Sequence, residues 1–475
     1  MQMSRRGFMG GAAGVVAGAR QAAAAGRPNV LYIIQEDIGP NAACFGEPLV
    51  RTPHTDRFAS QGILFRNMFC TGPVCSASRS ALMTGRYQTS IGAHNHRTWE
   101  WNKKPLVRPV RHISEWFRDA GYFTCNLGAA KAGKKQGRGA EGCGKIDLNF
   151  YLNGPEKSNF FDGNDWNDRR PGQPFFAHIT IMETHKGAGW KIARQQPKSE
   201  LVDPEKLKLG AYYPDSPIVR DEYANYLDAI HLSDGYLGQL LARLERDGLA
   251  KNTVVVLSSD HGPLFRGKQF LYDGGMRIPL IVRFPDGRSA GKVDDSLVSG
   301  IDLAPTMLGV AGILPPEGAM QGQDIFGPGY KERSHIFAAR DRMDTSVDRM
   351  RAVRTKRHKY IRNYLPAIPY MQANEYKEKN YPTWNLVKEW VKLGKLNKAQ
   401  ALFASSVKPI EELYDLAADP DEVNNLALDP AHKEILTQMR KLVDGFVAEN
   451  DAKVTFEDPV DIYKGYWRRL PEDAA

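Results

Sequence analysis

The chain has 475 residues, of which 42% are hydrophobic and 25% charged, so it can bury a sizeable core and is expected to form one large domain and a smaller one. Its net charge of +9 favours an anionic partner only weakly, because a basic excess spread over a large surface more often serves solubility. No run of Lys and Arg is interleaved with aromatic residues, so we expect no nucleic-acid partner.

Residues 1–26 have the character of an export signal rather than of a folded segment. A twin arginine, Arg5-Arg6, precedes an apolar stretch rich in Gly and Ala, and small residues follow it. This order predicts a Tat-type signal and a periplasmic or secreted protein, with a disordered Ala-rich tail as the alternative. No later segment is long and apolar enough to cross a bilayer, so we expect no stable membrane insertion.

The chain has an odd number of cysteines, which lack the paired short spacings of a zinc site. A Tat substrate folds in a reducing compartment before export, so no disulfide framework is expected. At least one thiol therefore needs another explanation. The five residues are Cys44, Cys70, Cys75, Cys125 and Cys143.

The first two thirds of the chain alternate between two apolar patterns. Near-continuous apolar runs, typical of strands buried on both faces, span residues 28–35, 175–182, 253–259 and 278–284. Helical spacing of apolar residues occupies residues 221–247 and 302–310. This alternation predicts an α/β fold in which helices sandwich a large, mostly parallel sheet.

The pattern changes after about residue 345 and predicts a smaller α+β domain. Strand-like segments at 350–364 and 412–416 surround an amphipathic helical segment at 381–405, and a closing helix is expected at 430–448. We therefore expect a larger domain over residues 27–345 and a second domain over residues 346–475.

Carboxylates and histidines follow the predicted strands at once. In open α/β sheets, sites gather beyond the carboxyl ends of strands. Each carboxylate alone would more often be a helix cap or a surface charge, but together they offer the oxygen donors that a hard divalent cation prefers. The candidate ligands are Glu36, Asp37 and Asp260.

Cys75 is predicted to begin a short helix, where unpaired backbone N–H groups and the positive helix end favour an anion. Arg79, one turn along, can turn its guanidinium towards the same anion. Taken alone, this pair says little, and a buried structural cysteine is the alternative.

The surroundings of Cys75 resemble the sulfatase family. The family signature, C-x-[P/A]-x-R followed by T-G, is matched from Cys75 to Gly85. P-N-V-L-Y-I-I-Q-E-D before it, S-S-D-H-G and R-G-K after it, and the tail E-L-Y-D-L-A-A-D-P-D-E-V-N-N-L-A extend the resemblance from Arg27 to about Leu428. A-R-D-R-M-D and I-G-A-H-N-H-R are most similar to bacterial relatives of heparan N-sulfatase.

The resemblance implies an alkaline phosphatase-like fold and a specific nucleophile. A separate formylglycine-generating enzyme would oxidise Cys75 to formylglycine, whose hydrate attacks sulfur and then expels sulfate. The modified residue would also contact a metal, with calcium as the first choice. Two departures from the family, Glu36 for Asp and His261 for Asn, leave the metal's identity open, because a nitrogen donor suits manganese or zinc better.

The resemblance also assigns roles to single residues, although a lone His or Lys is usually structural. His185, in E-T-H-K-G, matches the histidine that protonates the leaving group. Lys268 matches the lysine that holds a sulfate oxygen. Lys145 is the match for a further active-site lysine, with Lys131 as the alternative, and Asp147 takes the position of the histidine that deprotonates the diol.

Four residues close in sequence to these positions are candidates for substrate binding, although a satisfied polar loop is an equal alternative: His94, His96, Arg97 and Arg266. The basic, aromatic stretch 370–390 could line a groove for an acidic glycan, or form core and a solvated face.

The expected function is hydrolysis of sulfate ester or sulfamate groups of a sulfated carbohydrate. The alternatives are a phosphodiester or phosphonate monoester hydrolase of the same superfamily, and a catalytically silent protein that binds sulfated glycans.

Overall fold

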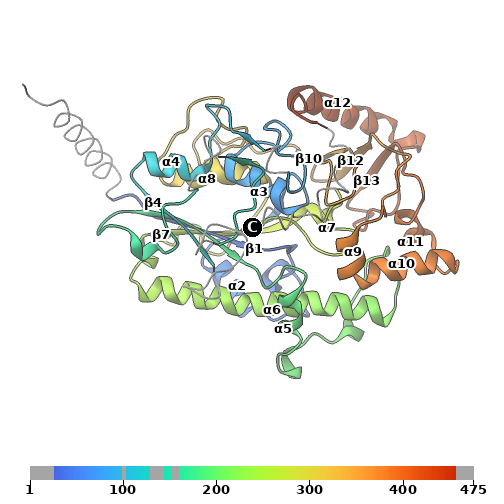
Figure 1. Cartoon of the computed structure of the whole chain (residues 1–475), viewed down its shortest axis with the longest axis horizontal. Helices are drawn as coiled ribbons and strands as arrows, with labels where there is room; N and C mark the ends of the chain where they lie inside the picture. The colour runs from blue at the N-terminus through green and yellow to red at the C-terminus, as the bar shows by residue number, and fades with distance from the viewer. Residues whose placement is uncertain (1–25, 99–102, 129–143, 152–159, 456–475) are drawn as a thin grey trace, which may run out of the picture.

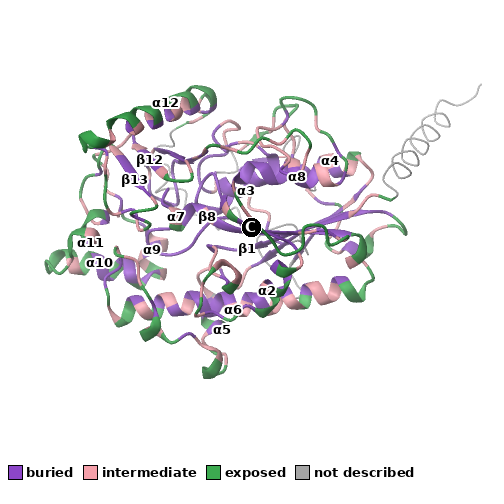
Figure 2. Ribbon diagram, turned by 180° about the vertical axis from the view of Figure 1, so that it is seen from behind, coloured by how far each residue is buried: buried purple, intermediate pink, exposed green. Residues whose placement is uncertain are grey.

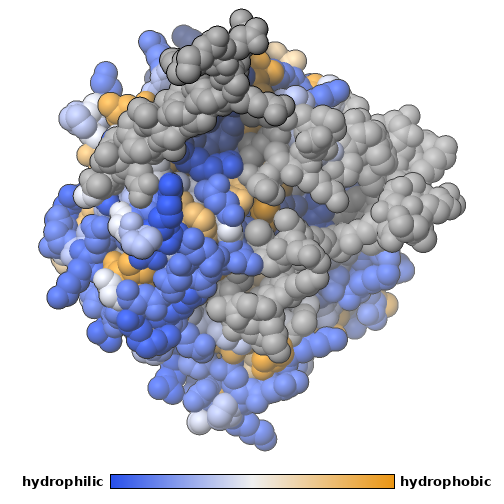
Figure 3. Space-filling model, turned by 60° about the vertical axis from the view of Figure 1, so that its left-hand side comes forward, coloured by the Kyte–Doolittle hydropathy of each residue, from blue (hydrophilic) through white to orange (hydrophobic). Residues whose placement is uncertain are grey.

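The computed structural model describes residues 26–98, 103–128, 144–151 and 160–455. The predicted signal up to residue 25, Lys131 and Cys143 lie outside them. Within the described residues, no helix has the length and apolar character needed to cross a membrane. The described surface in Figure 3 is mainly hydrophilic, with apolar side chains in small separate spots. The four cysteines that the structure describes are free thiols.

Seven strands of the described chain form the main sheet, in the order β4-β6-β1-β7-β8-β2-β9. β8 is paired antiparallel with both of its neighbours, while the other pairings are parallel, as the sequence predicts. The strands are β1 (Asn29–Gln35), β2 (Ile63–Phe69), β4 (Phe123–Gly128), β6 (Phe175–Ile181), β7 (Thr253–Ser259), β8 (Arg277–Arg283) and β9 (Lys292–Ser299).

Helices cover both faces of this sheet, as Figure 1 shows. α3 (Cys75–Thr84), α4 (Ile113–Asp119) and α8 (Leu303–Val310) lie on one face, and α2 (Pro53–Ser60) and α6 (Pro217–Arg246) on the other. Alternate residues of β1 enter different cores: Tyr32 packs in the α3–α4–α8 layer and Ile33 in the α2–α6 layer. Burial on both faces explains the continuous apolar strands.

α6 begins earlier than its apolar spacing predicts. The Ser216 side chain accepts a hydrogen bond from the Val219 amide, and Pro217 occupies the first turn, so capping chemistry sets the start. Figure 2 shows that α6 buries the side towards the sheet and exposes the opposite side.

A second sheet, of four antiparallel strands within the described chain, lies in the C-terminal part. It runs β10 (Ile336–Arg340), β11 (Met350–Arg354), β12 (His358–Asn363) and β13 (Glu411–Asp415), and thus begins before the boundary expected near residue 345. α12 (Lys433–Asn450) packs on it through a cluster that includes Val353, Leu413 and Met439.

The amphipathic segment expected at 381–405 forms two helices, α10 (Pro382–Lys392) and α11 (Lys398–Phe403). Gly394 adopts a φ of +62° just after α10, which ends that helix. α9 (Glu375–Asn380) precedes them. The shorter elements are β3 (Lys104–Pro105), β5 (Phe150–Tyr151), α5 (Ala188–Ala193), α7 (Asp273–Met276) and 3-10 turns at Ala43–Phe45, Trp166–Asp168, Lys198–Glu200, Pro204–Lys206, Ala250–Asn252, Gly300–Asp302 and Pro430–His432.

Candidate active site

Three neighbouring strands deliver the candidate residues to one edge of the sheet. β1 lies between β6 and β7, and the three are parallel, so their carboxyl ends meet. Asp37 follows β1 and Asp260 follows β7, and the Asp37 amide donates to Asp260 Oδ1 at 3.0 Å. Asp37 has a φ of +51°, a left-handed conformation that Asp tolerates better than most residues. The turn thus aims its carboxylate back over the sheet edge.

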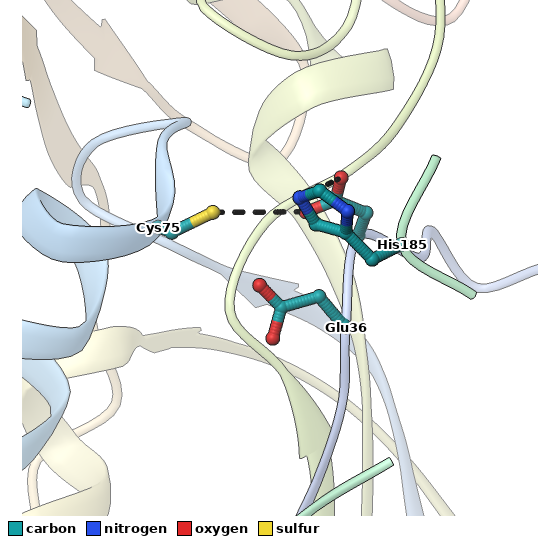
Figure 4. A group of neighbouring side chains, drawn as sticks. Glu36, Cys75 and His185 are labelled. Carbon is teal, nitrogen blue, oxygen red and sulfur yellow. Dashed lines mark hydrogen bonds and ion pairs between the residues drawn. The ribbon is translucent and has the colours of Figure 1, made fainter. Parts of the chain in front are cut away.

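Cys75 is the first residue of α3 and is fully buried. Its Sγ lies 3.3 Å from His261 Nε2 and 3.9 Å from Asp37 Oδ1. Figure 4 shows Cys75 pointing from α3 towards His185, with the Glu36 side chain beside them. Burial raises the pKa of the Cys75 thiol, but the charges of Lys145 and Lys268 outweigh it and lower the pKa overall. Residue 75 therefore sits where negative charge is favoured.

Four candidate ligands converge: atoms of Asp37, Cys75, Asp260 and His261 all lie within 4.8 Å of one another. His261 Nδ1 is 2.9 Å from the Gly262 carbonyl, which can only accept, so Nδ1 carries the hydrogen. The lone pair of Nε2 then faces Asp37 Oδ1 at 3.1 Å and Asp260 Oδ2 at 3.9 Å. A backbone carbonyl that fixes the tautomer in this way is usual for a metal-binding histidine.

This arrangement requires a cation. A buried lone pair facing carboxylate oxygens is repelled unless a proton or a metal lies between them. Burial alone would lower the pKa of His261, but Asp260 and Asp37 outweigh it and raise the pKa to about 9. The site therefore fits a divalent cation, which two carboxylates, an imidazole and residue 75 would bind. The imidazole is the nitrogen donor that the sequence indicates.

Glu36 has a different position from the other candidate ligands. Its Oε2 accepts from Arg79 Nη2 at 2.5 Å, and its Oε1 is paired with Lys145. It also belongs to a second, overlapping group with Asp37, Cys75 and His185. Because cations contact both of its oxygens, Glu36 has fewer free lone pairs for a metal than Asp37 has.

Arg79 donates hydrogen bonds to two carboxylates and one hydroxyl of the site. Besides Glu36, it binds Asp260 Oδ2 through Nε at 3.2 Å and Thr180 Oγ1 through Nη1 at 3.2 Å. The side chain is fully buried. Arg79 thus joins the ends of β1, β6 and β7.

Lys145 reaches the site from the segment that follows residue 143. Its ammonium contacts Glu36 and lies 3.3 Å from Asp147 Oδ2. Burial raises the pKa of Asp147, but Lys145 and Arg97 outweigh it, so the pKa falls well below the usual range and the carboxylate stays ionised. The structure thus brings both Lys145 and Asp147 to the cluster.

Lys268 and His185 approach Oδ2 of Asp37, whereas His261 approaches Oδ1. Lys268 Nζ donates to Asp37 Oδ2 at 2.7 Å, and His185 Nε2 lies 3.9 Å from the same oxygen. The His185 side chain is 24% exposed, whereas Lys268 is buried. Burial lowers the pKa of His185 to about 4, despite the nearby Asp37 carboxylate.

Tyr376, from α9, borders this side of the site. Its ring centroid lies 6.3 Å from that of His185 and 5.1 Å from Lys268 Nζ. The basic, aromatic character of the 370–390 stretch points to this region, but it does not single out Tyr376.

Two of the four substrate-binding candidates lie near the cluster. Arg97 Nη2 is 3.7 Å from Asp147 Oδ2, and its backbone amide donates to Ser76 Oγ at 2.7 Å. His96 is buried, and its Nδ1 lies 2.9 Å from Asp344 Oδ1.

The other two are held by the C-terminal part and are not brought to the cluster. His94 Nε2 lies 3.1 Å from the Thr455 carbonyl oxygen. The Arg266 guanidinium donates to the carbonyl oxygens of Asp421 and Glu422 at 2.6 Å each and is 4% exposed. These contacts join the two parts of the chain and leave the Arg266 guanidinium little surface for a sugar.

Two polar residues of β6, His178 and Thr180, were not among the site residues predicted from the sequence. A signal was present: polar residues at alternate positions of an otherwise apolar strand face the same side of the sheet. That side is the one on which Arg79 lies.

Family models match most of the chain. The model described as sulfatase matches residues 28–313, and the model of the N-sulphoglucosamine sulphohydrolase C-terminal region matches residues 260–380. An ulvan-active sulfatase of Formosa agariphila is 35% identical over 460 residues, which cover 88% of this chain and 74% of that protein. The chain belongs to the sulfatase family. It is therefore a sulfuric ester hydrolase.

Further relatives of this sulfatase match at lower identity. N-acetylgalactosamine-6-sulfatase of Mus musculus is 27% identical over 357 residues, covering 63% of this chain and 65% of that protein. Among solved structures, phosphonate monoester hydrolase of Agrobacterium radiobacter matches with a TM-score of 0.61 at 17% identity, covering 89% of this sulfatase and 96% of that chain. BT4656, solved with its substrate D-glucosamine-2-N,6-O-disulfate, matches with a TM-score of 0.59 at 18% identity, covering 90% and 100%. Because these identities are low, the structural matches establish only the fold, which is alkaline phosphatase-like.

Proposed function

We propose that this sulfatase removes sulfate from a sulfated carbohydrate, with residue 75 as the nucleophile after conversion of Cys75 to formylglycine. The observation that carries the proposal is the position of Cys75 Sγ, at the start of α3 and 3.3 Å from His261 Nε2. The names of the relatives support the substrate class: ulvan-active sulfatase, and BT4656 with a disulfated glucosamine. The match to the N-sulphoglucosamine sulphohydrolase C-terminal model supports a sulfated amino sugar, as ester or sulfamate.

The thiol of Cys75 stands in for the oxygen of the modified residue. A thiol that attacked sulfur would form a thiosulfate ester with no easy exit, whereas an aldehyde hydrate has a second hydroxyl through which sulfate can be expelled. The ionised Asp147 carboxylate, 3.3 Å from Lys145 Nζ, is the base that we assign to this second step. A formylglycine-generating enzyme is the partner that this chemistry requires.

We assign the divalent cation to Asp37, Asp260, His261 and residue 75, with Glu36 at its edge. When bound, the cation would polarise a sulfate oxygen and favour an ionised nucleophile. Calcium is our first choice for its preference for carboxylates, and the imidazole of His261 makes manganese the main rival.

Lys268, Lys145 and His185 have the two remaining roles, charge stabilisation and acid catalysis. Lys268 and Lys145 place positive charge beside residue 75, where a sulfate gains negative charge as its ester bond breaks. His185 is the acid for the leaving oxygen. Its pKa of about 4 applies without substrate, and a bound sulfate anion would favour the protonated imidazole.

Export by the Tat route to the periplasm or beyond remains part of the proposal and rests on Arg5-Arg6 and the apolar stretch that follows. Fractionation of cells that express the wild type and an Arg5→Lys, Arg6→Lys variant tests it, because the variant should stay in the cytoplasm.

One comparison tests the function against its rivals: turnover of an aryl sulfate, a phosphodiester and N-sulfoglucosamine by one preparation, with Cys75→Ala as the control. We expect sulfate release from an aryl sulfate or a sugar sulfate and none from the variant. Preference for the phosphodiester would favour the phosphonate monoester hydrolase alternative. Binding of sulfated glycan without any turnover would favour the silent protein.

A further inference from the structure

Beneath the site, the main sheet holds a buried polar pair that the proposed chemistry does not use. Asn126 in β4 and His178 in β6 are partners in the strand register, and the Asn126 Oδ1 to His178 Nδ1 distance is 3.0 Å. Both side chains are 0–1% exposed. Buried polar pairs of this kind fix one arrangement of their surroundings, because any other leaves polar atoms unpaired.

Asn126 holds Gly144, the residue just before Lys145. Its Nδ2 donates to the Gly144 carbonyl oxygen at 2.9 Å, and the Gly144 amide donates back to the Asn126 carbonyl oxygen at 3.2 Å. The backbones approach so closely that a Cβ on residue 144 would lie 2.4 Å from the Leu127 carbonyl oxygen. The backbone of the segment that carries Lys145 therefore packs directly against β4.

Only one assignment of donors and acceptors satisfies the hydrogen bonds of the Asn126 side chain. The Gly144 carbonyl can only accept, so the Asn126 amide nitrogen faces it and Oδ1 faces His178. His178 must then donate through Nδ1. Burial holds the pKa of His178 well below its usual range, so the ring is neutral and Nδ1 carries its hydrogen. Its ring stacks on Phe161 at 6.0 Å and 11°, which fixes its plane.

The far side of the Lys145 segment is anchored in a similar way. Asn149 Nδ2 donates to the carbonyl oxygens of Ala93 at 2.9 Å and Asn95 at 2.6 Å. Lys145 thus lies between two buried asparagine anchors, and its ammonium meets Glu36 beside Cys75. A long, flexible side chain can be held at a reacting centre only if its backbone is fixed.

We propose that Asn126, oriented by His178, is a positioning residue that places the Lys145 ammonium against Glu36 beside residue 75. The inference deepens the proposed function and rests on it for the catalytic effect of Lys145. Asn126 acts through the Gly144 backbone and touches neither sulfate nor metal.

The test uses Asn126→Asp, which replaces the donor to Gly144 by an acceptor of the same shape. The matched control is Asn29→Asp, which alters another buried asparagine, at the amino end of β1, where it binds Thr253 Oγ1 and the Phe175 amide. We expect kcat/KM for an aryl sulfate to fall about tenfold or more in Asn126→Asp, since small misplacements of catalytic groups cost up to 10²-fold. Asn29→Asp should lower the melting temperature and leave kcat/KM of the folded enzyme unchanged. Equal losses of kcat/KM in both variants would overturn the proposal.

A double-mutant cycle separates positioning from a general structural effect. Asn126→Ala should lower kcat/KM in the wild-type background and change it little in the Lys145→Ala background, because the residue that it positions is already gone. Losses that multiply would overturn the proposal.

A crystal structure of Asn126→Ala gives a readout that needs no turnover. We expect Lys145 Nζ to leave Glu36 in this variant, and retention of the Lys145–Glu36 contact would overturn the proposal. If the wild type releases no sulfate from any substrate, the proposed function fails, and the crystal structure still decides on Asn126.

Discussion

His261 Nε2 lies 3.1 Å from Asp37 Oδ1, while Nδ1 of the same ring faces the Gly262 carbonyl at 2.9 Å. The ring can therefore present only a lone pair to Asp37 unless it is protonated on both nitrogens. The site holds either a proton or a metal at this point, and which of the two it holds governs both activity and stability.

Removal of the metal should abolish activity. A chelator should strip the cation from Asp37, Asp260 and His261, and re-added cation should restore turnover and raise the melting temperature through its binding to the folded state. If manganese restores more activity than calcium in the wild type, His261→Asn should shift the preference towards calcium, because the nitrogen donor is lost. Elemental analysis with activity assays measures both, and full activity in protein free of metal would exclude the assignment.

The metal-free protein should become less stable as the solution turns alkaline. The pKa of His261 is raised from 6.5 to about 9 in the folded chain, so the protonated ring stabilises the fold fully below about pH 6.5. That contribution should be lost as the pH rises through 9. Denaturant titrations between pH 6 and 10 should show this slope in the metal-free wild type. His261→Asn should lack it, and an identical slope in the variant would place the titrating group elsewhere.

His185→Ala should slow hydrolysis of a sugar sulfate far more than that of an activated aryl sulfate. An alkoxide is a poor leaving group and needs a proton, so the loss should be about 10² to 10⁴ on the sugar. A phenolate leaves unaided, so its rate should change little. Steady-state kinetics on both substrates measures the difference. Equal slowing would instead assign His185 to binding or metal support.

Lys268→Ala should slow both of these substrates by a similar factor. Lys268 Nζ lies 2.7 Å from Asp37 Oδ2. We assign it to the sulfate group, which is common to both substrates. We expect a loss on the order of 10² or more if it acts as a donor to developing negative charge. A loss confined to the sugar sulfate would place Lys268 in sugar recognition.

Arg79→Ala should destabilise the fold strongly. It leaves Glu36 and Asp260 buried without their shared partner, a change that typically costs about 3–5 kcal/mol. Arg66 is a fair control, because its pair with Asp295 is exposed, and such pairs contribute about 0–1 kcal/mol. Urea titration of both variants gives the two values, and similar values would argue against a structural role for Arg79.

Much of the site could be predicted from the chain because parallel strands bring their carboxyl ends together. Asp37 and Asp260 are far apart in sequence, yet both directly follow buried strands, so their meeting needs only the strand order. The start of α3 at Cys75 was likewise readable from the motif.

The partners of long side chains could not be predicted, because they depend on the tertiary positions of the charged or polar groups at their tips. Arg266 is two residues from Lys268, but its guanidinium reaches the Asp421 and Glu422 carbonyls of the C-terminal part. Glu36 precedes Asp37, yet Arg79 and Lys145 occupy both of its oxygens. Closeness in sequence does not determine such tertiary partners, since neighbours along a chain can face opposite ways.

Mass spectrometry of the peptide that contains residue 75 shows whether Cys75 is the precursor of the nucleophile. Protein produced together with a formylglycine-generating enzyme should carry formylglycine at residue 75, and specific activity should rise in proportion to the modified fraction. Protein made without that enzyme should keep the thiol and be inactive. Full activity with an unmodified Cys75 thiol would contradict the account.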